Sequence, residues 1–487
     1  MTCIESELTG SQLGAALRLV ELGQVIVSSH LQQQLESIRG RITREFAEFS
    51  VAGVQVFQGL DNCDGLDVTL AVWMDRQGDV ASEACIGYWL MCVFLRGLDE
   101  NETRVLTKFL AGSFASNCSS NKRIVVRRYP TGGISEKQAL ILPAFLRYSC
   151  KKFGWSSSFL VARRLAHTGG THDKLAILPG MEFATTGDLR SWDGENPPVR
   201  YFSAGIDFCP RDALLYRFRG ETGTVPDRGL MVSSVMAKQV AMPADVIVLD
   251  VLYGATAFLK SERDAQTFVR WCQTAAASFN ISIVPFFRQS EDLLGRCVGN
   301  VAETLEAVQL LENAVGMEGG IKSYELLLSL KFMEIFAMKV GANSQEVVLH
   351  CLEGLQSGGI LRSLHQLWSE HGVASEFLEG LRRNSRSALL DGMSEVRVES
   401  LREGVVAGWD AFSIADIVNN RLNAYITSAN GSIVRSLRGG VELMVQKGSL
   451  IGKGECLAIF YSEIPSDIGD VRKALQQAFQ INRPDFS

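Results

Sequence analysis

The amino-acid sequence predicts an α/β protein with a small all-α domain, a large α/β domain built on a mixed sheet, and a C-terminal antiparallel β subdomain. Three observations lead to this prediction. Apolar residues recur at helical spacing through segment 82–114, and segment 246–251 is a near-continuous β-branched run of the kind buried in parallel sheets. After Glu395, period-2 runs alternate with glycine turns, as in antiparallel strands. A length of 487 residues fits two or three domains.

Helices are expected throughout the N-terminal part of the chain. Segments 13–22 and 31–49 carry apolar residues at helical spacing, and the Asn-Cys-Asp-Gly cluster at 62–65 is typical of a turn. Segment 82–114 should form two helices, the first capped by Ser82. Asp99 and Glu102 have the spacing of a capping box for the second helix, which should end near Gly112.

Strands alternate with helices from about residue 121 to 388. Strands are predicted at 124–126, 157–161 and 246–251, and segment 260–385 is rich in helix. Thr-Gly-Gly turns follow the first two strands, and Ser135 and Gln138 have capping-box spacing for the helix after the first turn. Near the C-terminus, four segments of alternating polarity predict the strands of a small antiparallel β unit, at 424–428, 432–437, 441–445 and 456–461. A terminal helix at 468–479 is expected to close this unit.

Composition narrows the function and the location. The chain has 48 Lys and Arg against 54 Asp and Glu, a net charge of −6, which disfavours general nucleic-acid binding. The longest uncharged apolar run, 84–95, is shorter than the about 20 residues that cross a bilayer, and no secretory leader is recognisable, so a cytoplasmic protein without membrane contact is expected. The 11 cysteines show no zinc-ligand spacing, which favours buried free thiols; neither a metal nor a cofactor is predicted.

The two Thr-Gly-Gly turns have the composition of anion sites. Glycine lets backbone N–H groups converge, and a helix N-terminus adds partial positive charge. The first turn contains Gly132 and Gly133. A pair of arginines, which could bind an anion, precedes each turn: Arg127 and Arg128 before the first, Arg163 and Arg164 before the second. The same glycines would serve any tight strand-to-helix turn, so the pattern alone leaves both interpretations open.

A longer pattern surrounds the second turn. Segment 162–175 reads ARRLAHTGGTHDKL, which resembles the signature SGRGLxHTGGTxDKLE of the thymidine and pyrimidine-nucleoside phosphorylases. Four further segments resemble that family's sequences in the same order: 82–112, 128–134 (RYPTGGI, for KHSTGGV), 231–251 and 299–306. The resemblance covers about residues 75–465. It implies a homodimer and four parts: a helical extension (1–74), an all-α domain (75–120 with 208–242), a central α/β domain (121–207 and 243–388) and a barrel-sandwich-like α+β domain (389–487).

The resemblance implies a pyrimidine-binding set and an altered anion site. Arg219, Ser234 and Lys238 fall on the family's base-binding residues, where cationic and hydroxyl groups stabilise the departing base; without the resemblance, Ser234 and Lys238 would be interpreted as an exposed helix face. Thr131 is a further substrate-binding candidate. At the phosphate end only Arg128 and Thr171 match. The family's His and three Ser are replaced by Tyr129, Pro130, Ala139 and Val161.

Losing three hydrogen bonds to a charged phosphate would weaken its binding by roughly 4–9 kcal/mol. We therefore expect a pentosyltransferase that cleaves or exchanges the C1′–N bond of a nucleoside or nucleotide, with Lys238, Arg219 and Tyr129 as catalytic candidates and orthophosphate use in question. The alternative is a catalytically silent pyrimidine- or nucleoside-binding regulatory protein. A third hypothesis makes the N-terminal extension a docking element for a partner. Lys447, on a predicted β turn, lacks the Met-Lys-Met pattern of a carrier lysine and is interpreted as a turn residue.

Overall fold

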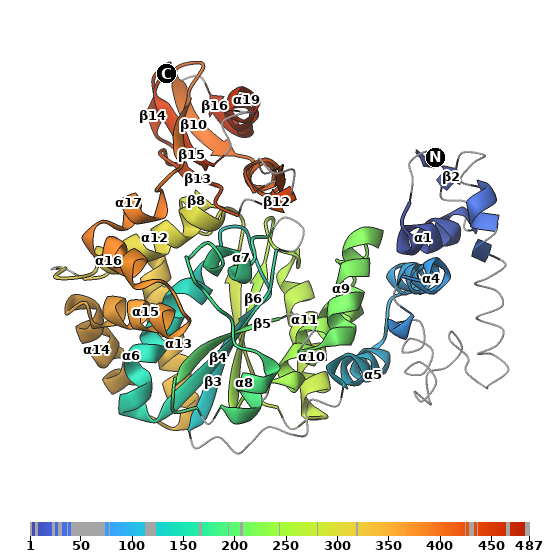
Figure 1. Ribbon diagram of the computed structural model, residues 1–487, viewed down its shortest axis with the longest axis horizontal. Coiled ribbons are helices and arrows are strands. Elements are labelled where there is room, and N and C mark those ends of the chain that lie inside the picture. The colour runs from blue at the N-terminus through green and yellow to red at the C-terminus, as the bar shows by residue number, and fades with distance from the viewer. Residues whose placement is uncertain are drawn as a thin grey trace. The chain divides into compact units, whose positions relative to one another are not determined.

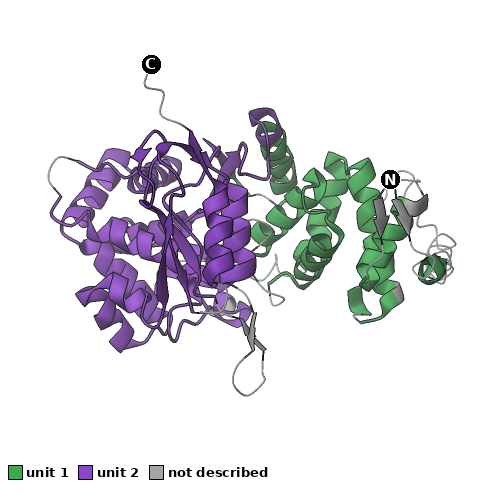
Figure 2. Cartoon of the chain, turned by 90° about the horizontal axis from the view of Figure 1, so that it is seen from above, with its two compact units in different colours: residues 1–118, 204–243, 266–283 green, residues 119–203, 244–265, 284–487 purple. Residues whose placement is uncertain are grey.

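The computed structural model divides the chain into two compact units, each described here by itself (Figure 2). Unit 1 comprises residues 1–118, 204–243 and 266–283, and unit 2 comprises residues 119–203, 244–265 and 284–487. The residues described are 2–4, 8–21, 25–27, 32–36, 38–39, 74–76, 78–112, 123–164, 168–192, 194–204, 208–242, 244–279, 281–317, 320–423, 425–427, 433–435, 437–463 and 468–482. The predicted turn at 62–65 and most of the predicted helix at 31–49 lie outside them.

Unit 1 is helical. Its helices pack through a shared apolar cluster that includes Leu17, Leu90 and Phe218. The elements are β1 (Thr2–Ile4), α1 (Gly10–Glu21), β2 (Val25–Val27), α4 (Val80–Arg96), α5 (Glu100–Ala111), α9 (Pro210–Thr222), α10 (Arg228–Ala241) and most of α11 (Glu262–Ala277). Glycine allows the close approach of α1 and α4, because a Cβ on Gly14 would lie 1.8 Å from the carbonyl oxygen of Ala84.

The helix starts in unit 1 test two of the capping predictions. The capping box at Asp99 and Glu102 is confirmed, with both reciprocal hydrogen bonds formed, and α5 ends at Gly112 as predicted. The cap at Ser82 is wrong. Asp79 is the N-cap of α4, and its carboxylate accepts the Ser82 N–H at 3.0 Å. The helix therefore starts three residues earlier than predicted.

Unit 2 contains a five-stranded sheet, which confirms the predicted α/β class (Figure 1). Its order is β5 (Val199–Ser203), β4 (Trp155–Val161), β3 (Ile124–Pro130), β6 (Val246–Tyr253) and β7 (Ile283–Gln289). The β5–β4, β4–β3 and β3–β6 pairings are parallel. Strand β6 is buried along nearly its whole length, as its β-branched sequence predicts. Strand β3 is longer than predicted because Arg127 and Arg128, both buried, find polar partners inside the unit.

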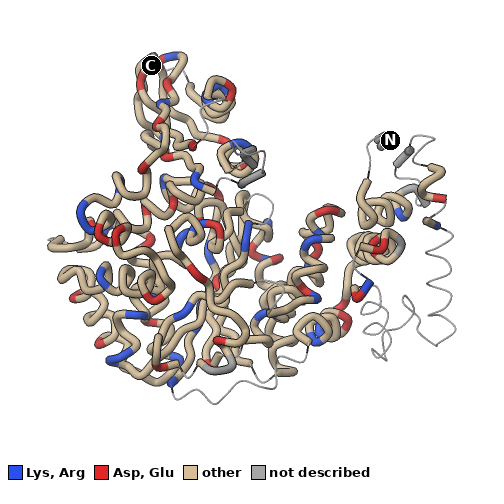
Figure 3. Tube along the Cα trace, in the orientation of Figure 1, with Lys and Arg blue, Asp and Glu red and all other residues tan. Residues whose placement is uncertain are grey.

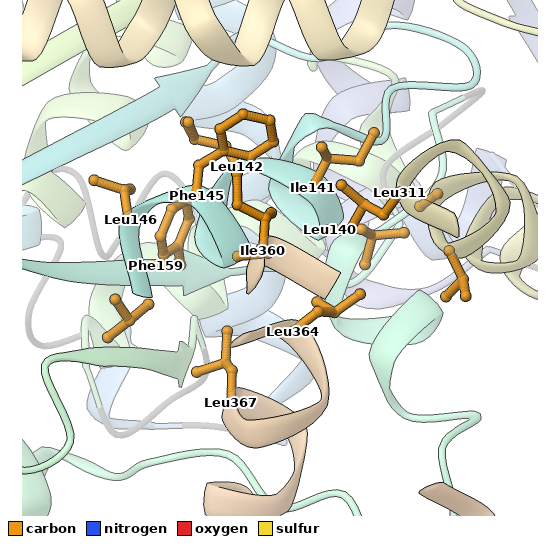
Figure 4. Packing of buried hydrophobic residues seen from close by; sticks show 14 of the residues in the cluster. Leu140, Ile141, Leu142, Phe145, Leu146, Phe159, Leu311, Ile360, Leu364 and Leu367 are labelled. Atoms are coloured by element: carbon orange, nitrogen blue, oxygen red, sulfur yellow. The ribbon is translucent and has the colours of Figure 1, made fainter. Parts of the chain in front are cut away.

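Helices α6 (Gln138–Phe153), α13 (Tyr324–Val340) and α15 (Gly359–Glu370) form the layer on one face of this sheet (Figure 1). Apolar side chains of α6 and α15 interlock with Phe159 of β4 (Figure 4). Further helices of unit 2 are α7 (Thr171–Leu175), α8 (Thr186–Ser191), α12 (Asn300–Glu312), α14 (Ser344–Gln356), α16 (Ser375–Arg383) and α17 (Ser385–Leu389).

The predicted capping box before α6 is wrong. Ser135 has a positive φ of 67°, and its hydroxyl donates to the carbonyl of Cys297 instead of capping the helix. The Gln138 amide donates to the Glu325 carbonyl at 2.7 Å. Both side chains serve tertiary contacts that sequence spacing does not reveal.

The C-terminal part of unit 2 is antiparallel, as predicted. One sheet has the order β8 (Cys297–Val298), β13 (Gly440–Leu443), β15 (Cys456–Ser462) and β9 (Ser394–Glu399), and a second has the order β14 (Leu450–Ile451), β10 (Gly404–Trp409) and β16 (Phe479–Asn482). The remaining elements are α18 (Ala411–Ile417), the π-helix η2 (Val418–Leu422), the antiparallel pair β11 (Tyr425–Thr427) and β12 (Ile433–Arg435), and α19 (Ile468–Ala478).

Neither charged residues of one sign nor cysteines are concentrated in one region of the described part of the chain. Basic and acidic residues are interspersed along both units (Figure 3). No helix in the described part of the chain has the length and apolar character needed to cross a bilayer. The cysteines whose side chains are described are free thiols, and six of them are buried: Cys85, Cys150, Cys209, Cys272, Cys297 and Cys351.

Candidate functional site

Ser234 and Lys238 lie one turn apart on α10, and the structure brings their side chains into contact. Lys238 Nζ donates to Ser234 Oγ at 2.9 Å and to the Ser234 carbonyl at 3.1 Å. It also lies 2.5 Å from Oδ2 of Asp212, near the start of α9. All three residues are buried. An ammonium has three N–H donors, so these contacts account for a full set.

The face of α9 toward this pair carries Asp212, Tyr216 and Arg219, whose spacing of four and three places them on one side of the helix. Lys238 Nζ lies 5.3 Å from the centroid of the Tyr216 ring, a cation–π distance. Burial lowers the pKa of Arg219, while the nearby Asp212 carboxylate supports its charged form. Asp212 therefore pairs directly with Lys238 and acts on Arg219 through its charge alone. We call Asp212, Tyr216, Arg219, Ser234 and Lys238 the α9–α10 cluster.

Arg219 is hydrogen-bonded to the backbone of the turn between α9 and α10 and of the first turn of α10. Its Nη1 donates to the Leu230 carbonyl at 3.1 Å, and its Nη2 donates to the Val225 carbonyl at 2.6 Å. The residue is 3% exposed, and its Nε–H is buried without a hydrogen-bond partner in the described structure. The Nε–H is therefore one of the five guanidinium N–H donors that has no acceptor within the described structure.

The two Thr-Gly-Gly loops lie at one edge of the unit 2 sheet. They follow β3 and β4, which are adjacent and parallel, and this is the edge where ligands bind in open α/β sheets. A Cβ added to Gly132 would lie 3.7 Å from Thr168 Cγ2 and 3.7 Å from the Phe258 ring, so the first loop lies against both the second loop and the segment after β6. The Thr131 hydroxyl accepts the Leu252 N–H at 2.9 Å, which fixes the start of the first loop.

Arg128, predicted to hold an anion, is committed to carboxylates inside unit 2. Its side chain has no exposed surface, and it pairs with Asp250 and, at 2.8 Å, with Glu136. Arg288 donates to the same Asp250 at 2.8 and 2.7 Å. Burial would raise the pKa values of Asp250 and Glu136, but the two guanidinium groups outweigh it and hold both below their usual range. In this arrangement two nitrogens of Arg128 bind carboxylates, while its Nη1 is buried without a hydrogen-bond partner in the described structure. We call these four residues the Arg128 network.

The remaining anion-site candidates differ in how open they are. Arg164 donates to the Asn419 carbonyl at 2.7 Å and to Asn420 Oδ1 at 3.2 Å, so it is a structural tie. Arg163 is exposed, and Thr171 is half-buried at the first residue of α7. Tyr129 is half-buried in β3.

The amino-acid sequence is similar to those of several known nucleoside phosphorylases. It is 27% identical over 397 residues to a pyrimidine-nucleoside phosphorylase of Geobacillus stearothermophilus, covering 80% of this chain and 87% of that enzyme. It is 26% identical over 409 residues to the thymidine phosphorylase of Homo sapiens, covering 82% of each chain. The Bacillus subtilis pyrimidine-nucleoside phosphorylase is 26% identical over 373 residues, covering 76% of this chain and 82% of that enzyme. The chain is a divergent relative of the thymidine and pyrimidine-nucleoside phosphorylases.

No family model matches the chain. Among solved structures, the anthranilate phosphoribosyltransferase of Thermus thermophilus aligns with a TM-score of 0.44 at 16% identity, covering 63% of this chain and 94% of that one. The Saccharomyces cerevisiae anthranilate phosphoribosyltransferase aligns with a TM-score of 0.44 at 12% identity, covering 69% and 98%.

This relative of the pyrimidine-nucleoside phosphorylases contains functional candidates that sequence reasoning missed. Asp212 and Tyr216 precede Arg219 by seven and three residues, so helical spacing alone could have placed them on its face. The carboxylate partners of Arg128 also had a signal, because an arginine in a buried strand requires an internal counter-charge. Arg288, far along the sequence on β7, had none.

Proposed function

We propose that this protein is a pentosyltransferase that cleaves or exchanges the C1′–N bond of a pyrimidine nucleoside or nucleotide. The observation that carries the proposal is the α9–α10 cluster, in which the buried Lys238 ammonium contacts the Ser234 hydroxyl and the Asp212 carboxylate, and Arg219 lies on the same face of α9 as Asp212. The relatives, named as thymidine and pyrimidine-nucleoside phosphorylases, support the same reaction class.

The cluster suits a base that leaves as an anion. Two cations and one carboxylate leave a formal charge of +1, which favours negative charge developing on the pyrimidine. Because Ser234 Oγ accepts a hydrogen bond from Lys238, its own proton is left to donate to a ligand oxygen. The Arg219 Nε–H supplies a second donor. Asp212 keeps Lys238 charged and oriented, while Tyr216 supplies an aromatic face beside it.

The acceptor half of the reaction rests on the glycine loops of unit 2. With Arg128 held by Asp250 and Glu136, the groups left for an anion are Thr131, Thr171, Arg163 and the backbone N–H groups at Gly132 and Gly133. This set is weaker than the one the resemblance implies. We therefore propose that the acceptor is a weakly held phosphate, water or another nucleophile. A homodimer, as the resemblance implies, and a cytoplasmic location, as the composition predicts, complete the proposal.

The internal pairing of Arg128 also favours a second candidate, a catalytically silent pyrimidine- or nucleoside-binding protein. Such a protein needs the α9–α10 cluster and no acceptor. It would be stabilised by pyrimidines without consuming nucleosides.

One experiment separates the two functions. Purified protein is incubated with thymidine, uridine and their 5′-monophosphates, with and without phosphate, and free base is measured beside thermal shift. An enzyme releases base from at least one of these, and the Lys238→Met variant does not. Stabilisation by thymine or uracil without release identifies the silent protein. If the protein neither releases base nor is stabilised by thymine or uracil, both proposed functions are refuted.

A further inference from the structure

The C-terminal part of unit 2 contacts the loop between β7 and β8 through Asp292. Trp409 Nε1, from β10, donates to Asp292 Oδ1 at 2.7 Å. Lys447 Nζ, from the turn after β13, lies 2.5 Å from Asp292 Oδ2 and 5.3 Å from the Trp409 ring centroid. We call these three residues the Asp292 clamp. Lys447 lies in a turn, as predicted, and its ammonium also pairs with the Asp292 carboxylate.

The loop that carries Asp292 supports the glycine-loop edge of the sheet. Leu294 N–H donates to the Ile134 carbonyl at 3.2 Å, directly after the first Thr-Gly-Gly turn, and Lys137 Nζ donates back to the Leu294 carbonyl at 2.6 Å. Thr256, in the segment after β6, donates from Oγ1 to the Asp292 carbonyl at 3.1 Å and from N–H to the Ser290 carbonyl at 3.0 Å.

Two further contacts join the same parts. Ile134 is 1% exposed and packs in the apolar cluster of the C-terminal sheets, with Leu293 and Trp409 at its margin. Before the second glycine loop, Arg164 donates to Asn419 and Asn420 in η2. The C-terminal part therefore contacts both glycine loops. Through Asp292 it also binds the β7–β8 loop, which is hydrogen-bonded to the first glycine loop.

We propose that Trp409 and Lys447 are positioning residues that fix the first glycine loop and the segment after β6 through Asp292. The side chains of Lys447 and Asp292 are 50% and 29% exposed, so the ion pair is modest and sensitive to salt, whereas the Trp409 hydrogen bond does not depend on salt. The effect on turnover rests on the proposed function. The effect on the loops does not.

Hydrogen–deuterium exchange of the full chain tests the proposal directly. Asp292→Ala should accelerate exchange in peptides covering 131–137 and 254–260 about 5- to 10-fold while leaving α15 unchanged. Lys447→Met should accelerate the same peptides about 2- to 5-fold, and Lys447→Arg should restore wild-type rates. In 0.5 M salt the wild type should approach Lys447→Met. Exchange of Asp292→Ala within twofold of wild type, or equal acceleration in α15, overturns the proposal.

The matched control is Lys453→Met, an exposed lysine on a neighbouring turn of the same β part, which should exchange as wild type. A kinetic readout separates positioning from general weakening. Asp292→Ala should raise KM for the acceptor, with phosphate as the probe, at least 5-fold, while KM for the nucleoside stays within twofold; equal rises in both contradict positioning. If the wild type releases no base, the proposed function is refuted. The exchange experiment then still tests whether the Asp292 clamp fixes the first glycine loop.

Discussion

Lys238 Nζ lies 2.5 Å from Asp212 Oδ2, and both residues are buried on facing helices of unit 1. A buried ion pair is costly to break from one side, because the remaining charge has no partner. The pair also determines how Ser234 is oriented, since the same ammonium donates to the serine hydroxyl. Asp212 thereby links the stability of the helix pair to the chemistry proposed for it.

Asp212→Ala should lower the free energy of unfolding by about 3–5 kcal/mol, because it leaves the Lys238 ammonium buried and unpaired. The double variant Asp212→Ala/Lys238→Met, which removes both charges, should recover part of that loss. Urea denaturation of the wild type, both single variants and the double variant measures the coupling. Additive effects would contradict the pairing.

Ser234→Ala should weaken binding of thymine or uracil about 3- to 10-fold, the effect of losing one neutral hydrogen bond. Isothermal titration measures the affinity. Ser233→Ala is the matched control, since that adjacent hydroxyl donates to the Thr103 carbonyl at 3.0 Å and serves helix packing. Equal affinity losses in both variants would remove Ser234 from base recognition.

The Arg128 network should make stability depend on acid. Asp250 and Glu136 have pKa values held below their usual range, so their stabilisation is complete above the unfolded-state pKa of about 4 and is lost as pH falls toward the folded-state values. Asp250→Asn should lower stability at pH 7 and flatten its fall between about pH 5 and 2. Free energies of unfolding across this range provide the test, with exposed Asp470→Asn as control. A variant with the wild-type slope would show that the network is not the titrating element.

Gly170→Ala should disrupt the second glycine loop. A Cβ at Gly170 would lie 2.3 Å from the Arg164 backbone nitrogen and 2.4 Å from the Arg163 carbonyl carbon, and backbone atoms cannot move aside cheaply. A loss of several degrees in Tm is expected. Gly469→Ala, on helix α19 where no atom lies within 4 Å of the added Cβ, should leave Tm unchanged or slightly raised. Equal Tm values for the two variants would contradict the tight contact.

The sequence predicted those elements of the fold that depend on residues close together in the chain. The β-branched run at β6, the capping box at Asp99 and the alternating C-terminal strands all follow from neighbouring residues. Side chains recruited by distant partners could not be predicted. Ser135 bonds the Cys297 carbonyl across the unit, and Arg128 pairs with Asp250, which is distant in the sequence, and with Glu136, in the segment after β3.

The candidate site divides in the same way. Ser234 and Lys238 were predictable as neighbours because they share one helix, and Asp212 and Tyr216 could have been added by helical spacing. The contacts that define the anion end depend on residues more than a hundred positions apart, such as Arg128 with Asp250 and Arg164 with Asn419. Their commitment to internal partners is a tertiary property.

The most direct test of the central claim is single-turnover release of uracil from uridine and thymine from thymidine, with excess protein and with or without phosphate. We predict base release by the wild type and a rate at least about 100-fold lower for Lys238→Met, because a preorganised cation at the departing base contributes on that scale. Release at equal rates by both proteins, or by neither, would contradict the assignment of the α9–α10 cluster as a catalytic base-recognition site.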